Sequence, residues 1–466
     1  MDLPPPLAFF LSLPTFDNPF AAMGYLIVHG GWFLILLTLL LGLWELWIFE
    51  IHEQYEHDKF KFMLLAVNVP KRSEQTAKAT ENFFSSLMGL HVSINMWENY
   101  VEGRKQEWFA CEIASHGGFI QFYIYIPVRQ RDIFEAAIFA QYPDAEVHEA
   151  QDYTLKYPNK YPSDEWDAWG TELVLKKSQC WPIKTYPLFE DKLSGTFKDP
   201  LSQLFEFMGT IQPGEELWVQ YPILPIEQDW QDPCRKEIDK MIGLRGGKKD
   251  EPNPLLALLH ALGDAVMYIV HSAVAGKAPE GRETAHKDDD PLAVRSNILA
   301  YGPGELLNGI ANKASKLGYK SKIRILYIAR KEIASKNRKR AVQGIMGVFR
   351  QFNAHDMNTF GLGRRTFVRA YYYFVQYRLN RRKNILMRAY RRRSVKRGDK
   401  PAVLSVEELA TLWHFPSLDI SAPLLRKAEV KRGEPPSGLP MADYDYAPPA
   451  PAPKPKDDIP ENLPFA

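Results

Sequence analysis

A long apolar stretch near the N-terminus dominates the hydrophobic pattern of the chain. Residues 25–44 (YLIVHGGWFLILLTLLLGLW) contain no charged side chain and a single histidine, His29. A helix of this length spans about 30 Å, the hydrocarbon thickness of a bilayer. Its leucines surround the helix axis, whereas a helix buried against a soluble core keeps a polar face. The pattern therefore predicts a transmembrane helix, placed within residues 21–49.

The charges on either side of this helix predict its orientation. Residues 1–20 contain no Lys or Arg, and basic residues follow the helix at Lys59, Lys61, Lys71 and Arg72. By the positive-inside rule, the short N-terminus (1–20) is extracytoplasmic and the body is cytosolic. A cleaved signal peptide is disfavoured because a basic n-region is missing. We expect a single-pass protein of the inner (cytoplasmic) membrane, with a polar juxtamembrane segment at 50–61 that is either a helical continuation or a linker.

The next segment alternates between strand and helix patterns. Strands are expected at 62–69, 107–114, 119–126 and 145–150, and helices at 73–90, capped by Ser73, and at 129–141. A glycine turn at 115–118 joins the two middle strands into a hairpin. The order strand, helix, strand, strand, helix, strand is typical of a ferredoxin-like unit, which we place at 62–180.

A related pattern follows at 181–400. After strand-like alternation at 169–177, still within the first unit, the second unit has a helix at 199–208, a strand at 216–224, a helix at 304–317, a strand at 321–330 and a helix at 337–352. A helical insertion at 231–295 interrupts this second unit and contains helices at 233–242 and 254–275. The second of these is long enough to span a membrane, but Asp264 near its middle favours a buried or interfacial helix. The predicted fold class is α+β: one transmembrane helix, two ferredoxin-like units, and a disordered Pro-rich tail at 441–466.

Composition adds an argument about the compartment. The 466 residues carry a net charge of +2, and the three cysteines, Cys111, Cys180 and Cys234, form no C-x-x-C pair. This usage argues against a disulfide framework or a thiolate metal site, and it agrees with a reducing cytosol.

We find no sequence motif of a catalytic or nucleotide site. Residues 243–250 lack the spacing of a P-loop and its Ser or Thr, and Gly361-Leu362-Gly363 lacks the third glycine of a dinucleotide fingerprint. No nucleophile elbow or Cys-His-acid set is recognisable. We therefore predict a protein that is not an enzyme, without catalytic residues, cofactor or metal.

The strongest local signal is a dense run of basic residues. It comprises Arg378, Arg381, Arg382, Lys383, Arg388, Arg391, Arg392, Arg393, Lys396 and Arg397, with Tyr390 among them. Such a density binds phosphate, whether on nucleic acid or on anionic lipid. The alternative is a solvated face that balances an acidic partner.

The C-terminal part resembles a known family. The sequences EELATLWHFP at 407–416 and EPPSGLP at 434–440 resemble the segment just ahead of the ATPase core in conjugative coupling-protein and HerA-like DNA translocases. Tyr142-Pro143-Asp144-Ala145-Glu146 is similar to a feature of the membrane-anchored modules that accompany those ATPases. Because this chain has no Walker residues, the resemblance implies a separately encoded P-loop ATPase as partner. It also implies a junction with that motor at 401–440, through Trp413, His414, Phe415, Pro416, Pro435 and Pro436.

Taken with the resemblance, these patterns predict a non-enzymatic membrane protein that anchors or positions a translocase ATPase of a type IV secretion or DNA-transfer system. Its basic run would contact DNA, anionic lipid or the motor, and assembly of several copies into a ring would suit this role. The first alternative is a membrane-tethered nucleic-acid-binding protein that acts without a motor. A membrane enzyme with an unrecognised site is the second.

Overall fold

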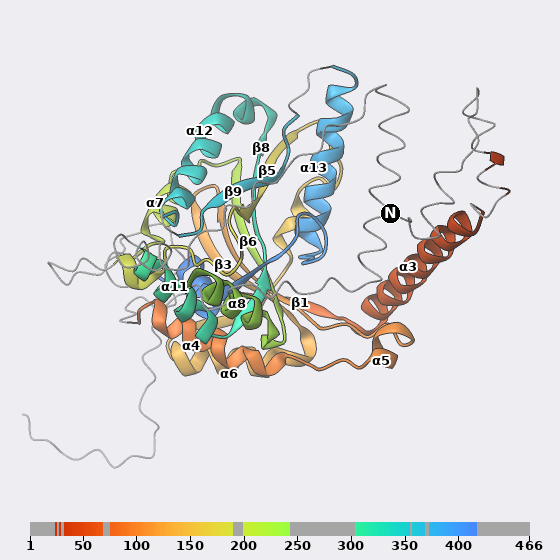
Figure 1. The fold of residues 1–466 in the computed structure, drawn as a ribbon. Coiled ribbons are helices and arrows are strands. Elements are labelled where there is room, and N and C mark those ends of the chain that lie inside the picture. Colours follow the sequence, from red (N-terminus) through yellow and green to blue (C-terminus); the bar gives the residue numbers. More distant parts are fainter. Residues whose placement is uncertain are drawn as a thin grey trace, which may run out of the picture. The chain divides into compact units, whose positions relative to one another are not determined.

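A computed structural model describes residues 24–25, 28, 32–68, 75–189, 199–242, 303–354, 357–368 and 372–416, and Figure 1 shows its ribbon. The predicted glycine-rich segment 243–250, the apolar helix at 254–275, the Pro-rich tail and the proposed cap Ser73 lie outside these residues.

The N-terminal helix α3 (Trp32–Lys59) is long and apolar enough, by length and composition, to cross a membrane. Its large side chains, including Trp44 and Trp47, are exposed, as expected of a helix that faces lipid. The prediction of a long apolar helix is therefore confirmed. The helix also continues through residues 50–59, so of the two alternatives for the juxtamembrane segment the structure has the helical continuation.

The first half of the sheet contains β1 (Phe62–Asn68), β2 (Phe109–His116), β3 (Phe119–Pro127) and β4 (Glu146–Ala150). The strands run antiparallel in the order β4-β1-β3-β2. The turn between β2 and β3 consists of Gly117 and Gly118, whose φ angles of 59° and 100° favour glycine. The associated helices are α4 (Ala77–Leu87), capped by the Thr76 side chain, and α6 (Arg131–Gln141).

The second half repeats this order with different strands. β5 (Trp166–Leu175), β6 (Glu215–Pro225), β8 (Ile323–Arg330) and β9 (Phe360–Arg365) are arranged antiparallel as β6-β8-β5-β9, with helices α7 (Ser202–Gly209) and α12 (Lys331–Arg350). If the four strands of each half are numbered 1 to 4 along the chain, both halves have the order 4-1-3-2 across the sheet: β4-β1-β3-β2 in the first and β9-β5-β8-β6 in the second. The predicted boundary between the two units, at residue 180, is too late: β5 ends before it but pairs with β8 and β9 of the second half.

The two halves join into one ten-stranded sheet, because β2 pairs antiparallel with β6 from Phe109↔Ile223 to His116↔Glu216. The strand predicted at 321–330 is divided, with β7 (Gly318–Ser321) pairing to β6 and to β10 (Ala402–Ser405). The remaining elements are α5 (Met96–Tyr100), α8 (Gln231–Ile242), α11 (Pro303–Ser315), α13 (Val375–Arg391), α14 (Val406–Leu412) and the short 3-10 helices η2 (Met88–Leu90), η3 (Val128–Gln130), η4 (Tyr153–Lys156), η5 (Tyr186–Phe189) and η6 (Gln228–Trp230).

The sheet has a core on each face. On one face, α4, α6, α7, α12 and α14 bury a large cluster that includes Phe84, Phe122 and Phe134. On the other face, Leu386 and Tyr390 of α13 pack against Trp218 and Leu326. Figure 1 shows α13 across the sheet from α7 and α12. Because helices cover both faces, the inner strands β2, β3, β6 and β8 are buried almost throughout, which explains their near-continuous apolar sequences, whereas the edge strands β4 and β9 are partly exposed and polar.

The cysteine prediction is wrong. Cys180 and Cys234 form a disulfide, with 5.1 Å between their Cα atoms. They lie 54 residues apart in the sequence, but the fold packs α8 beside the segment that follows β5, in a small core with Ile310 and Ala314 of α11. The spacing of cysteines therefore gives no argument for a cytosolic body.

Candidate anion-binding site

Six of the ten predicted basic residues lie on α13, a helix that the sequence analysis did not identify. Its apolar side chains Leu386, Met387 and Tyr390 recur at helical spacing and face the sheet. The basic residues between them divide into a group with internal partners and a group at the surface. The two groups have different roles.

Arg393 is the centre of the internal group. Its side chain is 1% exposed, and its Nε donates to Glu112 Oε1 at 3.0 Å while its Nη2 donates to Asp152 Oδ1 at 3.0 Å. Burial alone would raise the pKa of Asp152, but the hydrogen bonds and charge of Arg393 outweigh burial and hold this pKa below its usual value. Glu112 also accepts hydrogen bonds from Gln220 and from the Tyr153 hydroxyl. Arg393 is therefore a fully partnered core cation.

Other members of the run also have internal partners. Lys383 pairs with Asp167, and Arg391 donates to the carbonyl oxygens of Thr154 and Tyr157 at 2.8 and 2.5 Å. Arg392 pairs with Glu53 of α3 at 2.9 Å, and Arg397 lies 3.9 Å from the same carboxylate. These contacts hold α13 and the loop after it in place. Four of the ten basic residues, for which the sequence suggested an external ligand, therefore have partners within the protein.

A second buried pair, which the sequence analysis missed, secures the same loop. Arg324 of β8 donates from Nε to Glu172 at 2.7 Å, and both side chains are inaccessible to solvent. Its Nη2 donates to the carbonyl oxygens of Ser394 and Arg397 at 2.5 and 2.6 Å. Lone charged residues in apolar strands, such as Arg324 in IRILYIAR, are the sequence signal that would have identified it, since charges are rarely buried without a partner.

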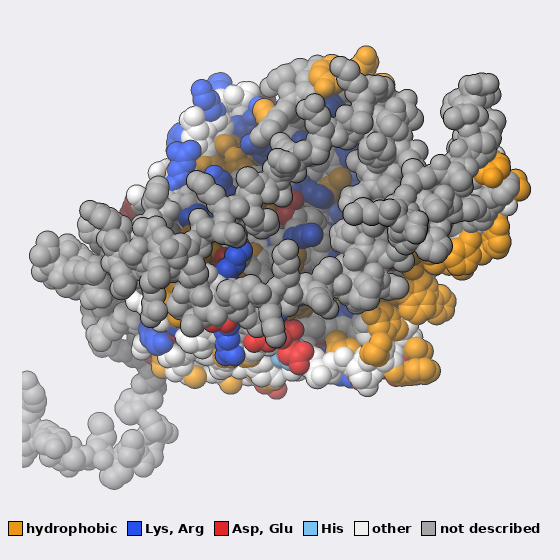
Figure 2. Space-filling model, viewed as in Figure 1, with side chains coloured by type: hydrophobic (Ala, Val, Ile, Leu, Met, Phe, Trp, Pro, Cys, Tyr) orange, Lys and Arg blue, Asp and Glu red, His pale blue; other side chains and the backbone are white. Residues whose placement is uncertain are grey.

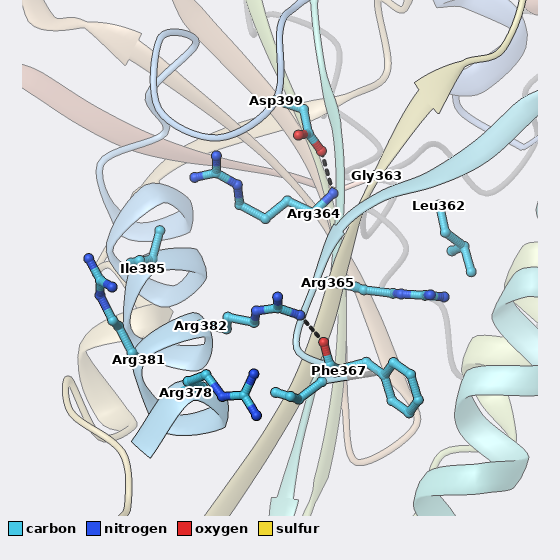
Figure 3. A pocket seen from close by; sticks show the side chains of 11 residues that line it. Leu362, Gly363, Arg364, Arg365, Phe367, Arg378, Arg381, Arg382, Ile385 and Asp399 are labelled. Carbon is cyan, nitrogen blue, oxygen red and sulfur yellow. Dashed lines mark hydrogen bonds between the residues drawn. The ribbon is translucent and has the colours of Figure 1, made fainter. Parts of the chain in front are cut away.

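The surface group lines a cleft of about 820 Å³ between α13 and the segment that begins with β9. Its lining includes the arginines Arg364, Arg365, Arg378, Arg381 and Arg382, together with Phe367 and one acidic residue, Asp399. Figure 3 shows Arg364 extending from the strand toward α13, and Arg378 and Arg382 extending from α13 toward the strand. In this view Arg365 points away from the helix, and Arg381 lies on its outer side.

Two guanidinium groups of this cleft are held by backbone carbonyl oxygens. Arg382 donates to the carbonyl oxygen of Phe367, and Arg378 donates to that of Tyr372 at 2.6 Å. Asp399 accepts from the backbone N–H of Arg364. Within the described ranges, the side chains of Arg364, Arg381 and Arg382 form no salt bridge with a carboxylate. The cleft therefore concentrates positive charge in a place that an anion can enter.

Exposed aromatic side chains adjoin the cleft at the start of α13. Tyr372, Tyr373, Phe374 and Tyr377 are each about 70–80% exposed, and Phe367 is partly exposed on the lining itself. Arg365 lies over the Phe367 ring, 5.1 Å from its centroid. Large rings are seldom left in water in a group, so this end of α13 has the composition of a contact surface.

The residues of the predicted motor junction lie inside the protein. Trp413, His414, Phe415 and Pro416 are buried, and Trp413 packs against Phe83, Phe84 and Phe122. His414 lies 2.7 Å from the Ala410 carbonyl oxygen and 3.0 Å from Asp199. Pro435 and Pro436 lie outside the described residues. The segment WHFP thus closes the core over α4 and does not present a docking surface.

In the part of the chain that the structure describes, we find no other set of chemical groups with a clear role. Among the described residues, no cluster of three or more His, Cys, Asp or Glu side chains is placed to hold a metal ion. Gly361-Leu362-Gly363 lies within β9, on the cleft side of the sheet edge. The sequence matches no protein-family model and no curated protein.

Proposed function

We propose that this protein is a membrane-anchored, non-enzymatic protein that binds a nucleic-acid strand in the cleft between β9 and α13. The observation that carries the proposal is the convergence of Arg364, Arg378 and Arg382 from two walls of one cleft. Guanidinium groups bind phosphate oxygens through paired N–H donors, and a chain of phosphates can contact several of them in succession.

The shape and the aromatic rim favour a strand over a bilayer surface. A strand can enter a cleft whose arginines face each other, whereas a flat membrane reaches only outward-facing charges. Exposed rings beside a basic groove are typical of proteins that bind single strands, because bases stack on them. Tyr372, Tyr373, Phe374 and Tyr377 supply such rings. Anionic lipid is the competing ligand, and the experiment below separates the two.

The fold and topology complete the proposal. We infer that each half of the sheet is a ferredoxin-like unit, supported by the shared strand order and the two helices of each half. We also propose that α3 spans the inner membrane, with the N-terminus outside and the cleft in the cytosol, supported by Lys59 and Lys61 directly after the apolar segment.

A role in positioning a separately encoded P-loop ATPase stays a prediction from the sequence resemblance, as does a ring of copies. The described part of the resembling segment, residues 407–416, is buried except for the partly exposed Glu407, so a motor would have to contact the protein mainly elsewhere. The described residues offer no observation that favours this role over nucleic-acid binding alone.

The test is binding of a labelled single-stranded oligonucleotide to the full chain in nanodiscs of zwitterionic lipid, measured by fluorescence anisotropy at several salt concentrations. The variant Arg364→Glu/Arg382→Glu should weaken binding. It should also make affinity less sensitive to salt, so that the negative slope of log affinity against log salt is smaller in magnitude by about 2, one for each lost phosphate contact. Arg388→Glu is the matched control, because Arg388 is exposed on α13 but does not line the cleft.

Two outcomes would contradict the proposal. One is an equal loss of affinity in the Arg388→Glu control, which would indicate a diffuse charge effect. The other is wild-type protein that binds no oligonucleotide but brings anionic vesicles to the nanodisc in an Arg364- and Arg382-dependent way, which would assign the cleft to lipid headgroups.

A further inference from the structure

The short helix α5 exposes several large apolar side chains to solvent. Met96 is 77% exposed, Trp97 is 67% exposed and Val101 is 50% exposed. The helix is well defined, because Asn95 and Glu98 form a reciprocal capping box at its start. A defined element that presents Met and Trp to solvent indicates a surface that contacts something apolar.

Helix α5 is fastened to α3 by specific contacts. The Tyr100 ring stacks on Trp44, with 6.0 Å between centroids. His52 Nε2 lies 3.0 Å from the Asn99 carbonyl oxygen. Further along, Gly103 approaches α3 so closely that a Cβ atom would lie 2.4 Å from the Ile51 carbonyl oxygen. The loop therefore packs directly on the helix that is apolar enough to cross a membrane.

These contacts place α5 at the level where α3 changes from apolar to polar. Trp44 belongs to the apolar part, and His52 lies about 12 Å further along the helix, in the first polar turns. Figure 2 shows hydrophobic side chains in a continuous band at the right, over the region that Figure 1 labels α3 and α5. The exposed apolar surface of α5 is thus continuous with that of α3.

Basic side chains lie beside this level on the polar side. A cavity of about 170 Å³ next to α5 is lined by His52, Lys105 and Lys396, among others. Lys105 pairs with Glu56 at 2.9 Å, whereas Lys396 is exposed and has no salt bridge among the described residues. Apolar side chains on one side and cations on the other match the order of acyl chains and phosphate headgroups in a membrane.

We propose that α5 is a second membrane-contacting element, which inserts Met96 and Trp97 into the headgroup–acyl boundary where α3 leaves the bilayer. Trp is favoured at this depth because its ring is apolar and its N–H is polar. With two contacts on the bilayer, the body could not rotate freely about α3. The inference rests on α3 as a membrane segment and not on the ligand of the arginine cleft.

The test is the depth of an environment-sensitive fluorophore attached to single introduced cysteines in the full chain, reconstituted with lipids that carry a nitroxide quencher near the top of the acyl chain. Native cysteines do not interfere under non-reducing conditions, because Cys180 and Cys234 are bonded and Cys111 is buried. Met96→Cys and Trp97→Cys report on α5, and replacing these exposed side chains disturbs no packing.

Two further positions serve as references. Leu40→Cys lies within the apolar part of α3 and should be quenched. Phe119→Cys is the matched control, because Phe119 is also large, apolar and 64% exposed, but begins β3 at the end of the sheet away from α3. We expect quenching at residues 40, 96 and 97 and none at 119. Quenching at 96 and 97 no greater than at 119 would overturn the proposal, and so would an unquenched residue 40, since α3 would then lie outside the bilayer.

Discussion

Replacing Arg393 by alanine is expected to destabilise the protein without acting on the arginine cleft. The change removes one partner of a buried network in which both Arg393 and Glu112 are inaccessible to solvent. Removing one member of such a pair costs about 3–5 kcal/mol, because the remaining charge stays buried. Glu112 keeps its hydrogen bonds from Gln220 at 2.7 Å and from Tyr153 at 2.8 Å, so we place the loss of unfolding free energy near the lower end, at about 3 kcal/mol.

The assay is urea unfolding of the full chain in detergent, followed by tryptophan fluorescence. Arg388→Ala is the control, since Arg388 is exposed on the same helix and its loss should change stability by less than about 0.5 kcal/mol. Glu112→Gln in the Arg393→Ala background neutralises the orphaned carboxylate and should recover part of the loss. If Arg393→Ala unfolds at the same urea concentration as Arg388→Ala, the assignment of Arg393 to the scaffold is wrong.

Three further predictions follow from particular contacts. The pKa of Asp152 is lowered in the folded state, so the stability that this carboxylate contributes is present above its unfolded pKa of about 4 and is lost as the pH falls through its folded pKa. The difference in unfolding free energy between wild type and Asp152→Asn should therefore be complete at about pH 6 and become smaller in unfolding curves recorded at acid pH. Gly103→Ala should release α5 from α3, because the new Cβ meets the Ile51 carbonyl at 2.4 Å and Gly103 has a φ of 69°; faster amide exchange in residues 95–104 would report this. If the body is cytosolic, acid-quenched cells should yield three maleimide tags per denatured chain, whereas a Cys180–Cys234 bond present in the cell would leave one tag, on Cys111.

Local patterns predicted most elements but not their assembly. The apolar run FIQFYIYI and the glycine pair before it identify the β2–β3 hairpin. The pairing of β2 with β6 joins residues about a hundred positions apart, and no local signal reports it. The strand β9, with sequence FGLGRR, is short and polar, so its edge position in the sheet had to come from the structure.

The site illustrates the same limit. A count of Lys and Arg finds the basic run but treats Arg393 and Arg382 alike, although Arg393 is buried against two carboxylates and Arg382 lines the cleft. Only the three-dimensional neighbours distinguish them. Arg364 and Arg365, from β9, were missed because they lie outside the dense run and join it only through the sheet edge. The sequence resemblance assigned WHFP to a junction with a partner, but in the structure its rings pack within the core.

Helix α13 links the two proposed contacts of the protein, with membrane and with nucleic acid. Its C-terminal end is tied to α3 by the Arg392–Glu53 pair and to the sheet by Arg393, and its N-terminal part carries Arg378 and Arg382 into the cleft, within a helix about 25 Å long. The exposed Arg392–Glu53 pair contributes at most about 1 kcal/mol, whereas the buried network costs several times more to break. The attachment of α13 to the sheet therefore comes mainly from buried contacts, namely the packing of Leu386 and Tyr390 and the Arg393 network. On the binding proposed above, Arg393 would contribute by holding the loop after α13 to the sheet and not by contact with the ligand.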